Sequence, residues 1–200
     1  MTNRRLLSLA TAAVGVLAFA GFASAGIPAV ANCTASSAGG TLYICPSGDA
    51  ESLGSVGAGV NITVRDVNSV PIANFPFQDI WLKSSVAGQI NLCQGGLTAD
   101  ANTDAAGQTT MTGVPSGGGC TQGPMQVVLS GVALPASQNL NIRMNSPDIT
   151  GDLSTNLADV GPFSSALNGA YNFCADYFDN GAINLADVGI FSSHLGHACN

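Results

Sequence analysis

A twelve-residue segment occurs twice near the C-terminal end of the chain. Residues 156–167 read NLADVGPFSSAL and residues 184–195 read NLADVGIFSSHL, so ten of twelve positions are identical at an offset of 28. A duplication of this quality predicts two copies of one small unit that pack on each other. Each copy has the spacing of a helix with one apolar stripe, and the predicted stripes are Val160, Phe163 and Leu167 in the first copy and Val188, Phe191 and Leu195 in the second.

Side chains bearing oxygen precede each copy at the spacing of a twelve-residue calcium loop. Such a loop takes oxygen ligands at positions 1, 3, 5 and 12, a backbone carbonyl at position 7 and often a bridging water at position 9. The first predicted loop spans residues 148–159 and the second spans residues 176–187. The expected ligands are Asp148, Thr150, Asp152, Ser154 (carbonyl) and Asp159 in the first loop, and Asp176, Asn180, Ala182 (carbonyl) and Asp187 in the second, with Asn156 and Asn184 orienting waters.

Each loop departs from the calcium-loop pattern. Leu153 replaces the glycine of position 6 and Thr155 the apolar residue of position 8 in the first loop, whereas Gly181 and Ile183 conform in the second. Phe178 removes the side-chain oxygen of position 3 in the second loop. Two alternatives therefore stay open. Either loop binds calcium weakly, or the two loops keep the calcium-loop fold without binding a metal.

Two such loops, each followed by one helix with Asp at position 12, resemble the duplicated repeat of type I dockerins over residues 147–195. The resemblance implies two calcium ions as cofactors and an extracellular cohesin-like domain as partner, met in two orientations. It implies partner contacts at Leu157, Ala158, Ser164 and Ser165 in one copy and at Leu185, Ala186, Ser192 and Ser193 in the other. The alternative is that the two leucines are core residues and the serines only a solvated face.

Residues 26–145 have the pattern of short β-strands. Apolar and polar residues alternate from Val60 to Val64, and further strands are expected at residues 42–44, 77–83, 88–92, 107–112, 125–129 and 140–144, with glycine-rich loops such as Pro115–Gly119 between them. Strands of this length and spacing favour an antiparallel sandwich. Residues 62–72 and 103–110 resemble bacterial immunoglobulin-like and carboxypeptidase-regulatory-like domains. We therefore expect a mainly β sandwich (immunoglobulin-like) at 26–145 and a small α-helical dockerin-like domain at 146–200.

The first 25 residues predict an export signal, because Arg4 and Arg5 precede an apolar run that ends at Ala23-Ser24-Ala25. No later segment is long and apolar enough to span a membrane. Without residues 1–25 the chain keeps three basic residues against twelve acidic ones, which excludes a nucleic-acid partner. We expect a secreted protein, extracellular or at the cell surface.

All six cysteines follow the predicted cleavage site, and an even count in an exported chain predicts disulfides. Proximity in sequence favours the pairs Cys33–Cys45, Cys93–Cys120 and Cys174–Cys199. A zinc site is not expected, because no close pair of cysteines or histidines has the usual ligand spacing.

These features favour a non-catalytic protein that attaches its sandwich to an extracellular partner. A calcium-stabilised subunit of a surface layer, fibre or matrix, with self-assembly, is the runner-up. An enzyme is disfavoured, because the only histidines, His194 and His197, lie at the extreme end of the chain, where His194 is expected on the helix surface. Trp81, the sole tryptophan, is expected in the core, with sugar stacking as the alternative. Sugar stacking would suit a third function, an accessory protein of polysaccharide degradation that binds carbohydrate.

Overall fold

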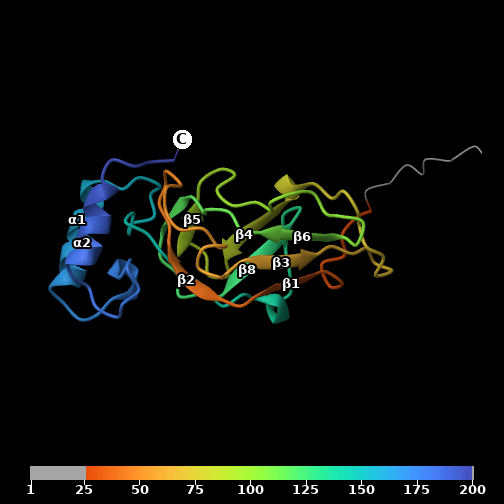
Figure 1. Ribbon diagram of the computed structural model, residues 1–200, viewed down its shortest axis with the longest axis horizontal. Helices are drawn as coiled ribbons and strands as arrows, with labels where there is room; N and C mark the ends of the chain where they lie inside the picture. The colour runs from red at the N-terminus through yellow and green to blue at the C-terminus, as the bar shows by residue number, and fades with distance from the viewer. Residues whose placement is uncertain (1–25, 200) are drawn as a thin grey trace, which may run out of the picture.

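The computed structural model describes residues 26–199, so the predicted export signal lies outside the described residues (Figure 1). The chain forms short strands followed by two helices. The strands are β1 (Thr34–Ser37), β2 (Gly40–Tyr43), β3 (Val60–Thr63), β4 (Ile80–Ser84), β5 (Ile90–Leu92), β6 (Gln108–Met111), β7 (Gly117–Gly119), β8 (Met125–Leu129), β9 (Val132–Ala133) and β10 (Ile142–Asn145). The helices are α1 (Leu157–Leu167) and α2 (Leu185–Ser193), and single 3-10 turns are η1 (Phe77–Asp79), η2 (Ala136–Gln138) and η3 (Phe173–Ala175).

Two three-stranded antiparallel sheets enclose the main hydrophobic core. One has the order β1-β3-β6 and the other β4-β8-β9. Ile62 and Met111 from the first sheet and Leu82 and Val127 from the second are fully buried in one cluster. Burying each such side chain stabilises the fold by about 1.5–3 kcal/mol. The β-sandwich expectation is therefore confirmed.

Strands β3 and β8 form where the sequence predicted strands. Val60 and Ile62 are buried while Asn61 is exposed, and β8 has the predicted bounds. The prediction of a wholly antiparallel sandwich was wrong, because β10 pairs with β2 in parallel, with Ile142 opposite Gly40. The two strands lie about a hundred residues apart in the chain, so no hairpin fixes their relative direction.

The glycine run Gly117–Gly119, predicted as a loop, is strand β7 and pairs with β5, with Ile90 opposite Gly119. Glycine has low strand propensity, so the sequence pattern does not reveal this strand. All three glycines are buried. The missing side chain of Gly118 allows Asp148, after β10, to lie directly against the sheet, whereas a Cβ on Gly117 or Gly119 would overlap the neighbouring backbone at Asn91 or Gln89.

Turn chemistry follows the predicted pattern at both β-turn motifs. The Asp66 carboxylate accepts hydrogen bonds from the N–H groups of Asn68 and Val70, both at 2.8 Å. Ser69 adopts the positive φ of 62° that glycine usually takes there. Asp104 holds the second turn in the same way.

Two disulfides join the helical end of the chain to the sandwich. They are Cys93–Cys199 and Cys120–Cys174, with Cα–Cα distances of 5.7 and 5.4 Å. All three pairs predicted from proximity were wrong, because the C-terminal segment folds back onto the sandwich and brings distant cysteines together. Cys33 and Cys45 are unpaired and buried.

The helices lie side by side at one end of the elongated molecule, next to β2 and β5 (Figure 1). Phe163 of α1 stacks on Phe191 of α2 with ring centroids 4.5 Å apart. No helix within residues 26–199 is long and apolar enough to cross a membrane.

Candidate metal loops and the helix face beside them

Asp148 lies at the centre of the first loop. Its side chain is fully buried and accepts hydrogen bonds from the N–H groups of Gly151 at 2.8 Å, Asp152 at 3.2 Å and Leu153 at 2.7 Å. The chain between positions 4 and 6 therefore wraps around one carboxylate. Asp159, also fully buried, closes the loop from its other end.

The Thr150 hydroxyl lies between these two carboxylates. Its oxygen is 3.1 Å from Oδ1 of Asp148 and 3.0 Å from Oδ1 of Asp159. Positions 1, 3 and 12 of the first loop therefore converge. Asp152, at position 5, is exposed and accepts a hydrogen bond from the Ser154 N–H at 3.0 Å.

The second loop repeats this arrangement around Asp176. That carboxylate is fully buried and accepts hydrogen bonds from the N–H groups of Asn180 at 3.2 Å and Gly181 at 2.9 Å. Asp187 is equally buried and accepts a hydrogen bond from the Phe178 N–H at 3.0 Å. Both carboxylates of the second loop are therefore held by backbone N–H groups of that loop, as in the first.

Each helix begins with a reciprocally capped turn. The Asn156 side chain accepts a hydrogen bond from the Ala158 N–H at 2.7 Å, while the Asn156 N–H donates to Asp159 at 2.9 Å. Asn184 and Asp187 form the same box at the start of α2. The position-12 aspartates therefore close a loop and cap a helix at once.

The backbone follows one path in both loops despite their different residues. Position 4 has positive φ in each copy, 71° at Gly151 and 47° at Asp179. Position 6 is also left-handed, 71° at Leu153 and 79° at Gly181. A non-glycine residue in this region is strained by about 1–2 kcal/mol, so Leu153 preserves the loop path at an energetic cost.

Position 8 of the two loops, Thr155 and Ile183, has different neighbours in each copy. The Thr155 N–H donates to the His197 carbonyl at 2.8 Å, and the Thr155 carbonyl accepts from the Gly196 N–H at 2.8 Å. The first loop therefore pairs with the C-terminal segment rather than with Ile183, which packs against the cluster between the helices. Phe178 is 64 % exposed and offers the second loop no side-chain oxygen.

Negative charge is concentrated in the two loops. Burial, and then repulsion from Asp159, raise the pKa of Asp148 above its usual value. Tyr177 stacks on Phe163, and its hydroxyl is buried without a hydrogen-bond partner. Burial and the nearby charges of Asp159, Asp187 and Asp148 raise the pKa of Tyr177.

No Lys or Arg pairs with the buried carboxylates of the loops in the described part of the chain. The one arginine pair is Arg143 with Asp179 at 3.7 Å, and both side chains are more than a third exposed. A buried carboxylate without a counter-charge is costly. The oxygen-only donor set and the missing counter-charge both fit a hard divalent cation.

The first loop lies directly against the sandwich. The Gly119 N–H donates to the Asp148 carbonyl at 2.6 Å, and the Asn91 side chain donates to the Gly151 carbonyl at 2.7 Å. A Cβ on Gly118 would overlap the Asp148 carboxylate. Strands β5 and β7 therefore form one wall of the first loop.

The residues predicted to contact a partner form an exposed, duplicated face. Leu157 is 84 % exposed and Leu185 is 85 % exposed, so the alternative that they are core residues is wrong. Ala186 is half-buried, and the remaining exposed positions are Ala158, Ser164, Ser165, Ser192 and Ser193.

The buried apolar stripe on each helix is narrower than predicted. Phe163 and Phe191 are buried and Val188 is half-buried, but the other three predicted positions, Val160, Leu167 and Leu195, are exposed. Ala166 and His194, one position before the two leucines, are buried in their place.

The expectation that His194 lies on the helix surface was wrong. It is 7 % exposed, and its Nδ1 lies 2.7 Å from the Ile190 carbonyl. Its ring faces Asp49 and lies near His197 and Cys45. No sequence spacing signals this cluster, because it joins residues 45–49 to residues 194–197.

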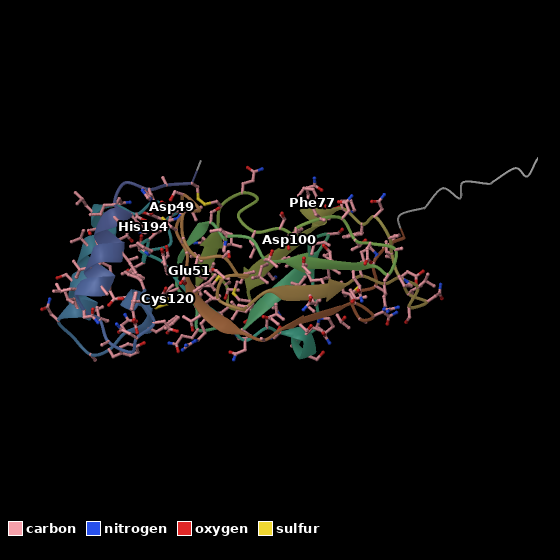
Figure 2. The ribbon with its side chains drawn as sticks, in the orientation of Figure 1. Asp49, Glu51, Phe77, Asp100, Cys120 and His194 are labelled. Atoms are coloured by element: carbon pink, nitrogen blue, oxygen red, sulfur yellow. A yellow bond between two sulfur atoms is a disulfide. The ribbon has the colours of Figure 1, made fainter. Side chains whose placement is uncertain are left out.

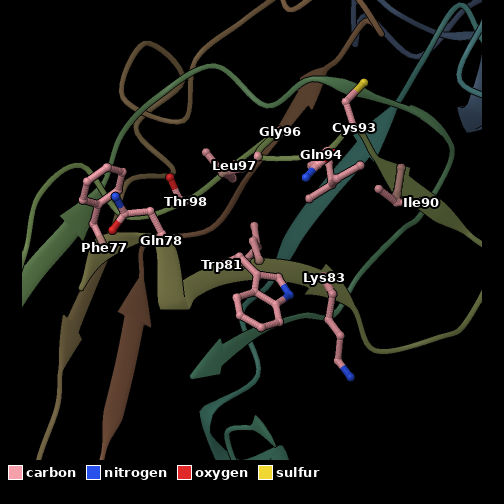
Figure 3. Close-up of a pocket in the computed structure, with 13 residues that line it drawn as sticks. Phe77, Gln78, Trp81, Lys83, Ile90, Cys93, Gln94, Gly96, Leu97 and Thr98 are labelled. Atoms are coloured by element: carbon pink, nitrogen blue, oxygen red, sulfur yellow. The ribbon is translucent and has the colours of Figure 1, made fainter. Parts of the chain in front are cut away.

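A hollow of about 700 Å³ lies on the outer side of β4 (Figure 3). Trp81 is half-buried and lines it beside Phe77, Lys83 and Gln94, so Trp81 is not the core residue that its strand position predicted. Sugar stacking on Trp81 stays a prediction.

No family model matches the chain, and no curated protein matches it. Among solved structures, the filamin domain of Lin-41 is similar at 11% identity with a TM-score of 0.32, over 58% of this chain and 96% of that one. An interface mutant of a type II cohesin–X-dockerin complex from Acetivibrio cellulolyticus is similar at 18% identity with a TM-score of 0.26, over 82% and 97%. At these TM-scores neither likeness carries a functional argument.

Proposed function

We propose that the chain is an exported, non-catalytic attachment protein. Its two loops bind calcium, and the helix face beside them binds an extracellular protein. The observation that carries the proposal is the complete burial of Asp148, Asp159, Asp176 and Asp187, without a lysine or arginine partner in the described residues, in two loops with one backbone path.

Calcium suits this donor set better than other common ions. Carboxylate, hydroxyl, amide and backbone oxygens are the ligands that hard cations take, and a twelve-residue loop matches the flexible geometry of calcium. Bound calcium supplies the positive charge that the buried aspartates lack. The first loop offers more side-chain oxygens than the second, because Phe178 has none, so we expect tighter binding in the first.

The position-12 aspartates couple the loops to the helices. Asp159 and Asp187 each accept a hydrogen bond from an N-cap residue, so ordering a loop also fixes the first turn of its helix. Leu157 and Leu185 are the first residues of those turns. A filled loop therefore holds its exposed leucine in a defined direction.

The exposed leucines favour a protein partner. Burying one leucine side chain stabilises a complex by about 1.5–3 kcal/mol. Leu157 and Leu185 are both exposed in the isolated chain, so a partner that buries them gains this stabilisation at each position. Small residues around each leucine allow a partner's backbone to approach closely. Because the two faces share their sequence, we propose that a cohesin-like domain binds either face.

A binding assay with single and double variants tests this proposal. The chain lacking residues 1–25 is presented to a panel of purified cohesin domains, with calcium or with a calcium chelator. Leu157→Asp or Leu185→Asp alone should change the Kd by no more than about threefold, because one face remains, whereas the double variant should lose at least about 100-fold. Val67→Asp, at an exposed position on the sandwich, is the control.

Equal binding in chelator, or full binding by the double variant, contradicts the proposal. The runner-up is a calcium-stabilised structural subunit. This structural function is favoured by the two disulfides and by the packing of the first loop on β7, which join the helical end rigidly to the sandwich. A structural subunit should self-associate in the presence of calcium in sedimentation experiments and should not bind a cohesin.

A further inference from the structure

Four side chains with different ligand chemistry converge where the helical end meets the sandwich. Cys45 and Asp49 follow β2, His194 follows α2, and His197 lies in the C-terminal segment. One ligand atom from each lies within 4.8 Å of the other three. Figure 2 shows Asp49 and His194 close together at this boundary. We propose that this cluster binds a zinc ion, at a site separate from the oxygen loops.

Three distances within the cluster have the length of ligand–ligand edges in a zinc site. Cys45 Sγ lies 3.5 Å from His197 Nδ1, His197 Nδ1 lies 3.4 Å from Asp49 Oδ2, and His194 Nε2 lies 3.8 Å from Asp49 Oδ1. The two histidine–aspartate distances exceed the length of good N–H···O hydrogen bonds, which is about 2.7–3.2 Å. Zinc bonds of about 2.0–2.3 Å in a tetrahedron give ligand–ligand edges of about 3.3–3.8 Å.

The orientation of His194 leaves one ring nitrogen available for a metal. Nδ1 lies 2.7 Å from the Ile190 carbonyl, which accepts but never donates, so the proton belongs on Nδ1. Nε2 then presents its lone pair toward the Asp49 carboxylate. Two acceptors that face each other are unfavourable, so either a second proton or a metal cation must lie between them. A backbone carbonyl that orients a histidine is a common support for metal ligands.

Other uses of the cluster fit less well. Cys45 is fully buried, and burial raises the pKa of its thiol, so it is a poor nucleophile. Ser47 lies 2.9 Å from His197 Nδ1 and donates to Asp49, which satisfies His197 without a metal. That arrangement still leaves the Nε2 of His194 facing a carboxylate. The mixed sulfur, nitrogen and oxygen donors select zinc over calcium.

A metal here has a structural role in the fold. It joins the turn after β2 to the end of α2, beside the Cys93–Cys199 disulfide. His197 also carries the carbonyl that pairs with Thr155 of the first loop. A bound ion therefore fixes the segment that supports that loop. Four protein ligands leave no open position, as in structural zinc sites.

Cobalt substitution tests the proposal without interference from calcium. The chain lacking residues 1–25 is stripped of metals, saturated with calcium to fill oxygen sites, and titrated with Co²⁺. We expect one equivalent to give a thiolate-to-cobalt charge-transfer band and the intense visible bands of tetrahedral cobalt. One equivalent of Zn²⁺ should then abolish both.

Variants assign the ligands. Cys45→Ser should remove the charge-transfer band, and His197→Ala, at a half-exposed position, should weaken zinc binding at least about 100-fold. Cys33→Ser, at the other unpaired cysteine, should change neither. A wild-type titration without thiolate bands, or unchanged zinc affinity in the His197 variant, overturns the proposal.

Discussion

Gly118→Ala should disable the first loop while leaving the second intact. Gly118 lies in β7, and a Cβ at this position would overlap the Asp148 carboxylate. Asp148 cannot move freely, because three backbone N–H groups of its own loop hold it. The added methyl group must therefore displace either the carboxylate or the strand.

The cost follows from the contacts that are lost. Hydrogen bonds to a buried charged group contribute about 1.5–3 kcal/mol each, and displacing Asp148 breaks at least one or two. We therefore expect Gly118→Ala to lower the free energy of unfolding by about 1.5–6 kcal/mol. Calcium binding should fall from two equivalents to one, because the atoms nearest to the added Cβ all belong to Asp148 of the first loop.

Urea denaturation and calcium titration of the variant measure both effects. Gly113→Ala is the matched control, since its Cβ would meet only Leu97 Cδ1 at an ordinary 3.8 Å. The control should stay within about 0.5 kcal/mol of the wild type. Two full calcium equivalents in Gly118→Ala would refute the placement of Asp148 against β7.

Three further predictions concern single groups. Asp187→Asn should weaken calcium binding in the second loop about 10- to 100-fold by titration, whereas Asp179→Asn, at exposed position 4, should leave it unchanged. Replacing Cys120 and Cys174 by serine, which opens a loop of 54 residues, should lower stability by about 4 kcal/mol in urea; an unchanged midpoint would contradict this. Partial burial raises the pKa of Asp100, but its hydrogen bonds with Thr110 and Thr112 lower that pKa further, so it lies below its usual value. Asp100→Asn should therefore lower the free energy of unfolding by about 0.5 kcal/mol at neutral pH. The difference from the wild type should vanish as pH falls through the lowered pKa, and a difference that stays constant with pH would refute this assignment.

Periodic and local features were predictable from the sequence. The alternation from Val60 to Val64 located β3, and the duplicated segments located both helices. These features depend on residues a few positions apart, where backbone geometry determines which side chains meet. The convergence of positions 1, 3 and 12 in the first loop belongs to the same class.

Contacts between distant segments were not predictable. The disulfides connect positions separated by 106 and 54 residues, and proximity in sequence gave the wrong pairs. The glycines of β7 lack strand propensity, yet the first loop needs the missing side chain of one of them, Gly118. His194 was assigned to the surface because helical periodicity alone does not show that the turn after β2 covers that side of α2.

Counting calcium ions on the intact chain tests the central claim most directly. The protein lacking residues 1–25 is stripped with chelator, returned to calcium, and examined by native mass spectrometry alongside calorimetric titration. The account predicts two bound calcium ions, with the second loop the weaker site. A chain that retains no calcium under these conditions would contradict it, because the four buried aspartates would then need another source of positive charge.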